Sequence, residues 1–173
     1  MEEILNNLGR IHDLRVSSRT SVEQFRNNSN KSIPEIAKAL GVNYIVEGSG
    51  QKYGNLLHLT LQLIDAAEDK EIWTESYEKE LKDATDIFKI QSQVAQSIAA
   101  EMKTVITSEE KQLIEKSATS NLTAYYFYQK GREEHLNYWL NLNDRDALVQ
   151  AEKLSHKEIK YDSTFAQDYA GLA

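Results

Sequence analysis

One short stretch constrains the fold more than any other, because leucine recurs there at every second position. These leucines, with polar side chains between them, are Leu57, Leu59, Leu61 and Leu63. Such alternation predicts a β-strand with one buried face. Gly54-Asn55 just before it predicts a hairpin turn from a strand at Tyr44–Tyr53. After a turn at Ala66–Lys70, the β-branched and aromatic residues of Ile72–Tyr77 predict a further antiparallel strand.

Apolar residues at helical spacing surround these strands. Glu2–Ile11 predicts an amphipathic helix. Ser32 and Glu35 form a capping box for a second helix, which Gly41 ends. Apolar residues at steps of three and four predict a long helix at Asp86–Val105 that packs across the sheet.

The segment Leu14–Ser17 alternates like a short strand, and it is joined to the later strands through a helix. Residues 1–106 are therefore expected to form an α/β domain, with helices packed on a mixed sheet of four strands. Only the early strand should pair in parallel. Trp73 and Tyr77 lie on the same face of the predicted strand. We interpret this face as part of a core under the long helix, and the alternative is a surface on which a ligand stacks.

From Thr107 onward no strand-like alternation recurs, and Thr107 with Glu110 forms another capping box. Residues 107–121 are expected to be a helical linker, and residues 122–173 to be all helical. The predicted helices of this part are Asn121–Trp139, Asp144–Tyr161 and Thr164–Ala173.

Composition excludes several kinds of chemistry. Without cysteine there is no disulfide, thiolate nucleophile or Cys-based metal site. The 20 basic and 27 acidic residues give a net charge of −7 and no basic face, which argues against nucleic acid. The longest apolar runs fall far short of the ~20 residues of a membrane span.

Candidate catalytic and metal sites are weak. His58 with Asp65 or Glu75 lacks the spacing of metal ligands, so no metal or cofactor is expected. Gly48-Ser49-Gly50 lacks the lysine of a phosphate loop, and it is interpreted as a bulge or a close backbone approach. Carboxylates near the turns, such as Glu75 and Glu78, are interpreted as a solvated face, with acid–base catalysis as the alternative.

The helix after residue 121 carries more aromatic side chains than one helix face can bury. We expect some of them to line a groove for a partner protein or peptide. The candidate residues are Tyr125, Tyr126, Tyr128, Tyr138 and Trp139.

The first part of the chain, from Met1 to Met102, resembles the TolB amino-terminal-like (FlgO-like) domain of bacterial multidomain proteins. The segments that carry the resemblance are Met1–Leu8, Leu14–Ser21, Ile36–Ser49, Leu61–Ala66, Ile72–Tyr77 and Asp86–Gln91. The family domain usually opens with an apolar strand that pairs with Leu14–Ser18, and none precedes Met1 here. The resemblance thus implies a fragment with an open sheet edge, which favours a homodimer.

In that family tetratricopeptide repeats follow the domain, and the tail of this chain resembles their beginning. Ala124–Gly131 is similar to a first repeat helix, Ala151 to a second-helix contact, and Phe165–Ala173 to the next repeat. Glu158 and Ser163 depart from the Ala and Pro of the pattern. The array is expected to be truncated.

The resemblance implies a noncatalytic sensory or protein-interaction module of a larger bacterial protein, such as an adenylate or guanylate cyclase-type signalling protein. The effector would lie outside this chain. An alternative is an envelope-associated structural protein similar to TolB or FlgO, and a third class is an enzyme that uses the hairpin carboxylates. The compartment stays open between cytoplasm and periplasm, because it depends on what precedes Met1.

Overall fold

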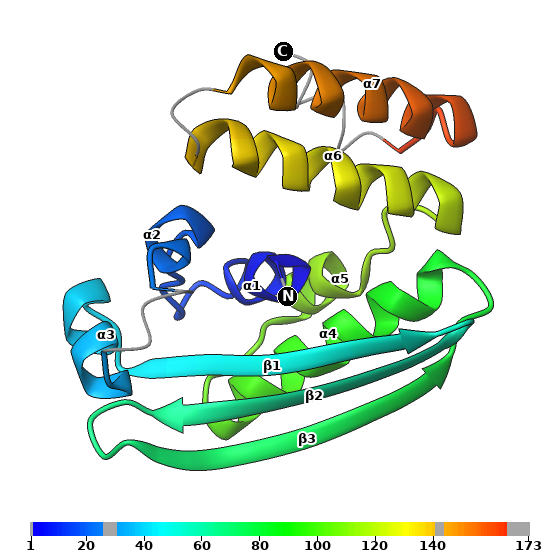
Figure 1. The fold of residues 1–173 in the computed structure, drawn as a ribbon. Coiled ribbons are helices and arrows are strands. Elements are labelled where there is room, and N and C mark those ends of the chain that lie inside the picture. The colour runs from blue at the N-terminus through cyan, green and yellow to red at the C-terminus, as the bar shows by residue number, and fades with distance from the viewer. Residues whose placement is uncertain (1, 26–30, 141–143, 166–173) are drawn as a thin grey trace. The chain divides into compact units, whose positions relative to one another are not determined.

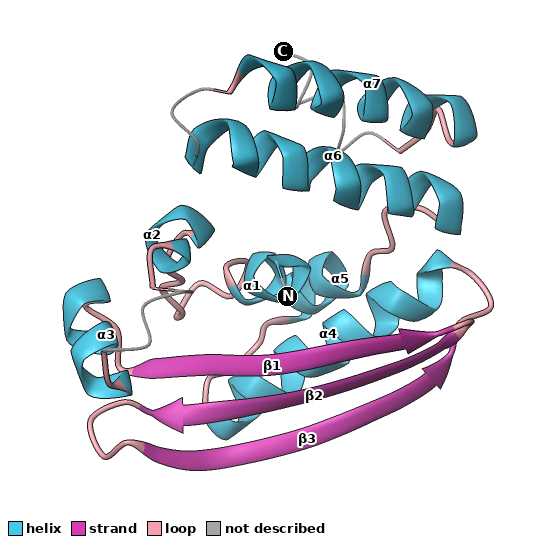
Figure 2. Cartoon of the chain, viewed as in Figure 1, coloured by secondary structure: helices cyan, strands magenta, loops and turns pink. Residues whose placement is uncertain are grey.

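The computed structural model describes residues 2–25, 31–140 and 144–165, which combine helices with one β-sheet (Figure 2). They fall into two compact units. The first unit draws its residues from Met1–Leu81 and Lys89–Lys116, and the second from Lys82–Phe88 and Ser117–Ala173. Within the described ranges, no helix has the length and apolar character that crossing a membrane requires.

The sheet of the first unit is an antiparallel meander in the order β1-β2-β3 (Figure 1). Its strands are β1 Tyr44–Tyr53, β2 Leu56–Asp65 and β3 Lys70–Glu80. Tyr53 pairs with Leu56 across the predicted two-residue turn, where Gly54 has a φ of 56° and Asn55 does not have a positive φ. A positive φ at the first turn residue alone is typical of a type II′ hairpin. Both predicted hairpins are confirmed.

Two predictions about this sheet were wrong. Leu14–Ser17 is not a strand, because among the described residues it has no neighbouring strand with which to form a ladder. The sheet is consequently three-stranded and wholly antiparallel rather than mixed. Of the bulge or close backbone approach expected at Gly48-Ser49-Gly50, the bulge is absent because the β1–β2 register is unbroken, and the irregularity lies instead between β2 and β3 at Leu63/Ile64.

Apart from α2 (Arg19–Glu23), which was not predicted from the sequence, the helices of the first unit start and stop largely where the sequence predicts. They are α1 Glu2–Leu8, α2 Arg19–Glu23, α3 Ile33–Leu40, α5 Ser108–Glu115 and the part of α4 (Ala84–Glu101) from Lys89 onward. Glu35 accepts hydrogen bonds from the backbone N–H and hydroxyl of Ser32, and Gly41 ends α3 at a φ of 66°. The Thr107–Glu110 capping box of α5 is also confirmed.

The C-terminal end of α4 departs from the prediction. Lys103 adopts a φ of 56°, and the backbone N–H of Thr104 donates to the carbonyl of Ala99 at 2.9 Å. These are the features of a Schellman C-cap, which ends the helix before Val105. Val105, expected on the packed face, is therefore 75% exposed.

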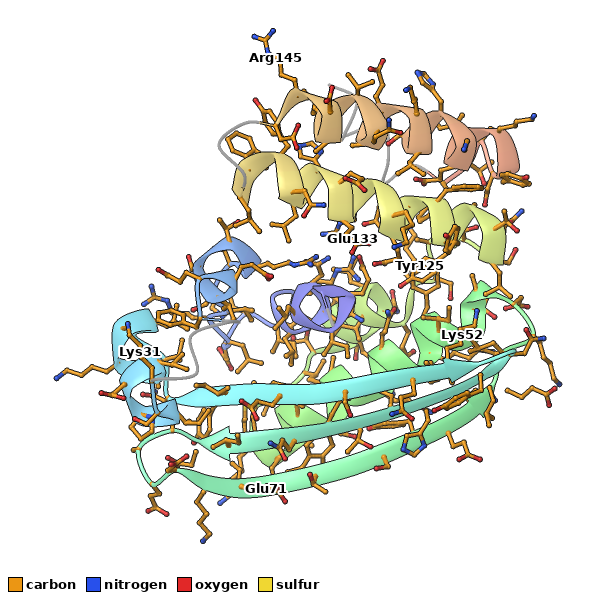
Figure 3. The ribbon with its side chains drawn as sticks, viewed as in Figure 1. Lys31, Lys52, Glu71, Tyr125, Glu133 and Arg145 are labelled. Carbon is orange, nitrogen blue, oxygen red and sulfur yellow. The ribbon has the colours of Figure 1, made fainter. Side chains whose placement is uncertain are left out.

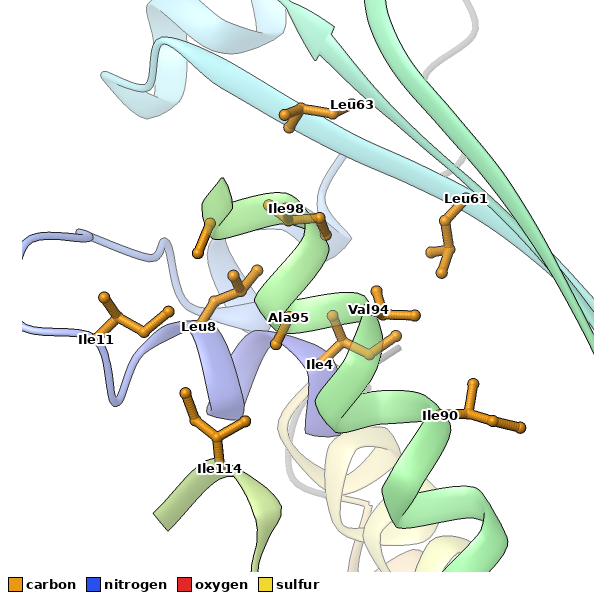
Figure 4. Packing of buried hydrophobic residues seen from close by; sticks show 11 residues of the cluster. Ile4, Leu8, Ile11, Leu61, Leu63, Ile90, Val94, Ala95, Ile98 and Ile114 are labelled. Carbon is orange, nitrogen blue, oxygen red and sulfur yellow. The ribbon is translucent and has the colours of Figure 1, made fainter. Parts of the chain in front are cut away.

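The core of the first unit forms where α4 crosses the leucine face of β2 (Figure 4). Leu61 and Leu63 are fully buried, whereas Leu57 and Leu59 are partly buried against the same cluster. The other buried side chains of this cluster come from α1 and the turn after it, α4 and α5, and include Ile4, Leu8, Ile11, Ile90, Val94, Ile98 and Ile114. The alternation of the leucines therefore predicted the buried face of β2 correctly.

The second unit is built on two helices, α6 Leu122–Leu140 and α7 Arg145–Tyr161, which pack together. They approach closely at Gly131, where a Cβ atom would lie 3.6 Å from the Leu154 Cβ. Asp144 caps α7 by accepting hydrogen bonds from the backbone N–H groups of Asp146 and Ala147. Of the helix expected at Thr164–Ala173, residues 166–173 lie outside the described residues. The repeat assignment and the domain boundaries stay predictions.

Candidate functional site

Two of the five candidate groove residues lie in the core of the second unit. Tyr125 and Tyr128 are both buried. The Tyr125 ring meets Phe88 edge-on at 5.2 Å between centroids, and the Tyr128 ring lies 5.0 Å from that of Phe165 (Tyr125 is labelled in Figure 3). These contacts are of the kind that stabilises an aromatic core. The expectation that Tyr125 and Tyr128 line a groove is therefore corrected, because their rings are not available to a partner.

The other three candidates reach the surface at two separate places on α6. Tyr126 is 56% exposed, and Trp139 is 63% exposed beside the partly buried Tyr138. The rings of Tyr138 and Trp139 meet at 5.3 Å between centroids. With a rise of about 1.5 Å per residue, Tyr126 and Trp139 stand roughly 20 Å apart along the helix. The structure thus presents two aromatic spots in place of one groove.

No sequence pattern predicted the aromatic contact that joins α6 to α7. Phe127 stacks on Tyr161 with 5.6 Å between the ring centroids. The ammonium group of Lys157 lies 5.5 Å from the Phe127 centroid, within the range of a cation–π interaction. Lys157 and Tyr161 are four residues apart on α7, a spacing that places them on one helix face.

Asp65 and Glu75, two of the acidic residues considered for a metal site or for catalysis, take part in local structure. Asp65 accepts hydrogen bonds from the backbone N–H groups of Ala67 and Glu68 and so shapes the β2–β3 turn. Glu75 accepts from the hydroxyl of Tyr77 at 2.7 Å. Among the residues that the structure describes, no cluster of three His, Asp or Glu side chains is arranged to hold a metal ion.

His58 and Tyr77 occupy different environments on the sheet. His58 lies near Glu78, with 3.7 Å between Nδ1 and Oε2, and both side chains are largely exposed. Tyr77 and Trp73 are instead partly buried against the first core, as the core interpretation expected. Burial raises the pKa of Tyr77 to about 12, because the phenolate form is poorly solvated there.

A shallow cavity of about 360 Å³ lies in the first unit between α1 and residues 16–19. Arg10 and Arg19 contribute to its lining. The Arg10 guanidinium donates to the Asn7 side chain at 2.9 Å and to the carbonyl of Leu113 at 2.7 Å. Sequence reasoning missed this cavity because it treated the segment after Leu14 as a strand.

The chain is similar to a protein of Rhizobium meliloti (strain 1021) described as "Putative adenylate cyclase 3", with 24% identity over 172 residues. The aligned region covers 99% of this chain and 28% of that relative, so the chain spans less than a third of the relative's length. No protein-family model matches the chain. No solved structure matches it either.

Proposed function

We propose that this chain is a noncatalytic sensory and protein-interaction module of a bacterial adenylate or guanylate cyclase-type signalling protein. The observation that carries the proposal is the extent of the similarity to "Putative adenylate cyclase 3", which takes in 99% of this chain and 28% of the relative. Nearly all of this chain thus corresponds to a minor part of a much longer, cyclase-named protein. A module attached to an effector fits that relation.

The roles of the polar side chains support a noncatalytic module. Glu35 and Glu110 cap helices, and Asp65 shapes a turn. Asp162 accepts from the hydroxyl groups of Thr119 and Thr164, each at 2.6 Å. Carboxylates that accept such local hydrogen bonds stabilise helix ends and turns rather than converging on a reacting group.

In this proposal the first unit is a TolB amino-terminal-like domain, and α6 with α7 begins a tetratricopeptide array. The close approach of the two helices at Gly131 supports the repeat assignment, because a small residue is what such a crossing requires. The aromatic spot at Tyr138 and Trp139 would then contact a partner protein or peptide. Binding there would change the assembly, and thereby the output, of an effector outside this chain.

The first test is to read the coding sequence on both sides of the chain in the same frame. The proposal expects a cyclase-type effector domain there. A secretory signal without an effector would replace it with the envelope-associated alternative. The second test is to incubate the purified chain with ATP or GTP and a divalent cation, where formation of a cyclic nucleotide would refute a noncatalytic role.

A third test uses the full-length protein and a matched pair of variants. Trp139→Ala removes the most exposed aromatic side chain of α6, and Val149→Ala removes a smaller exposed side chain of α7. We expect the first variant to alter cyclic-nucleotide output and the second to leave it unchanged. Equal outputs in both variants would exclude this aromatic spot as the partner site.

A further inference from the structure

The two edges of the sheet differ in their protection against pairing with another strand. The edge strand β3 is rich in charge, and its pairing with β2 is irregular at Leu63/Ile64. Charged side chains and irregular pairing are the usual devices that prevent edge-to-edge association. The other edge strand, β1, carries only Glu47 and Lys52 as charged residues and no proline, and its register is unbroken over 10 residues.

The outer edge of β1 is also uncovered. Among the described residues, β1 pairs with β2 alone. Every residue from Glu47 to Tyr53 is exposed, although alternate residues of this stretch share the side of the sheet on which the leucines of β2 are buried. Tyr53 near the hairpin turn is 69% exposed, and Figure 3 marks the neighbouring Lys52 on the same strand.

The hairpin turn determines which backbone groups of β1 point outward. Residues that flank a two-residue turn exchange both hydrogen bonds, so Tyr53 and alternate residues before it are bonded to β2. The other end of the ladder agrees, because the backbone N–H of Ala66 donates to the carbonyl of Asn43 at 3.0 Å. The outward-pointing N–H and C=O groups therefore belong to Val46, Gly48, Gly50 and Lys52.

We propose that a second copy of this chain docks antiparallel on the outer edge of β1, so that one sheet runs through both copies. In such a dimer, related by a two-fold axis normal to the sheet, each β1 residue with outward-pointing backbone groups must lie opposite another such residue of the second copy. The register centred on Ser49 meets this condition. It pairs Gly48 with Gly50 and Val46 with Lys52 through backbone hydrogen bonds, at positions where the glycines add no side-chain bulk.

Side-chain pairs are favourable in the same register. Centring the axis on Ser49 places Glu47 opposite Gln51 and Ile45 opposite Tyr53. An aromatic ring opposite a β-branched side chain is a favourable cross-strand pair. Registers centred on Glu47 or Lys52 would instead set like charges directly opposite each other, which is destabilising. The proposal does not depend on the cyclase-type assignment.

The native chain and two single-cysteine variants test this dimer. Ser49→Cys places a thiol on the two-fold axis, at a non-hydrogen-bonded pair whose Cα atoms would be about 4.5 Å apart, which a disulfide can bridge. The native chain has no cysteine to interfere. Ser76→Cys is the matched control, because Ser49, Thr60 and Ser76 form one row across the sheet and Ser76 lies exposed on β3.

We expect the native chain to double its mass in sedimentation equilibrium as its concentration rises. Under mild oxidation Ser49→Cys should form covalent dimer about tenfold or more faster than Ser76→Cys, because docking raises the effective concentration of the thiol. A native chain that stays monomeric at every concentration overturns the proposal. Equal oxidation rates in the two variants do the same.

A charge variant gives an independent readout that needs no cysteine. Ser49→Lys would set two ammonium groups face to face on the axis, while leaving the exposed surface of the monomer otherwise unchanged. We expect it to abolish the mass doubling, whereas Ser76→Lys should preserve it. A dimer that survives Ser49→Lys must use another surface, and this result would refute docking at β1.

Discussion

The crossing of α6 and α7 at Gly131 gives a prediction that runs against the usual view of a small residue between packed helices. A Cβ atom at Gly131 would lie 3.6 Å from the Leu154 Cβ, 3.7 Å from the carbonyl oxygen of Ala151 and 3.7 Å from the Ser155 hydroxyl. All three are ordinary van der Waals distances. Alanine should therefore fit, and its higher helix propensity should stabilise the fold by about 1 kcal/mol.

Urea unfolding followed by circular dichroism measures this gain, which corresponds to a rise in Tm of roughly 2 to 4 °C. Gly131→Leu is the steric control, because a longer side chain cannot fit beside Leu154 and should destabilise by about 1 to 3 kcal/mol. Gly41→Ala is the conformational control. No atom lies within 4 Å of its Cβ position, yet a φ of 66° should make alanine cost about 1 to 2 kcal/mol there. A Gly131→Ala variant less stable than the native chain would refute the reasoning.

Three further predictions concern buried or hydrogen-bonded side chains. Phe165→Ala should cost about 3 to 5 kcal/mol in urea unfolding, because the ring is fully buried against Tyr128, and a loss below about 1 kcal/mol would contradict that burial. Hydrogen bonds, first of all from the Thr119 hydroxyl, lower the pKa of Asp162, so its contribution is full above the ordinary carboxyl pKa and is lost as the pH falls through the lowered value. The stability difference between the native chain and Asp162→Asn should therefore shrink on acidification, and a constant difference would disagree. Burial raises the pKa of Tyr77 to about 12, so its contribution is full below the ordinary tyrosine pKa and is lost as the pH rises through about 12. Ultraviolet titration should show that Tyr77→Phe removes a late-titrating phenol, and removal of an early one would count against this.

Patterns that depend on neighbouring residues predicted their elements well. The leucine alternation located β2 and its buried face, and Gly54-Asn55 located the hairpin turn. The capping boxes at Ser32 and Thr107 marked the starts of α3 and α5 within a residue. Each of these elements is determined by a backbone conformation or a hydrogen bond of residues close together in the sequence. A local sequence pattern is therefore enough to predict it.

Features that depend on distant parts of the chain were predicted poorly. Leu14–Ser17 alternates like a strand, yet alternation does not supply a neighbouring strand. Val105 continues the helical spacing, but the left-handed conformation of Lys103 stops α4 before it, and no glycine signals that stop. Sequence spacing also could not tell which aromatic residues of α6 are buried, such as Tyr125 and Tyr128, and which are exposed. The α6 aromatics occupy consecutive positions, so they face in all directions around the helix.

The contacts within the sheet and those between the α1 region and α5 differ in the sequence separation of the residues that they join. β1, β2 and β3 are consecutive and joined by short turns, so each pairing needs only a small loop to close. Contacts between the turn after α1 and α5 reach much further: Arg10 bonds to Leu113 across 103 residues, and His12 to Glu110 across 98. Closing a long loop costs more entropy and slows folding. In kinetic terms the meander should form first and the N-terminal helix should dock last, so pulsed hydrogen exchange during refolding should find the amides of α1 protected after those of β2.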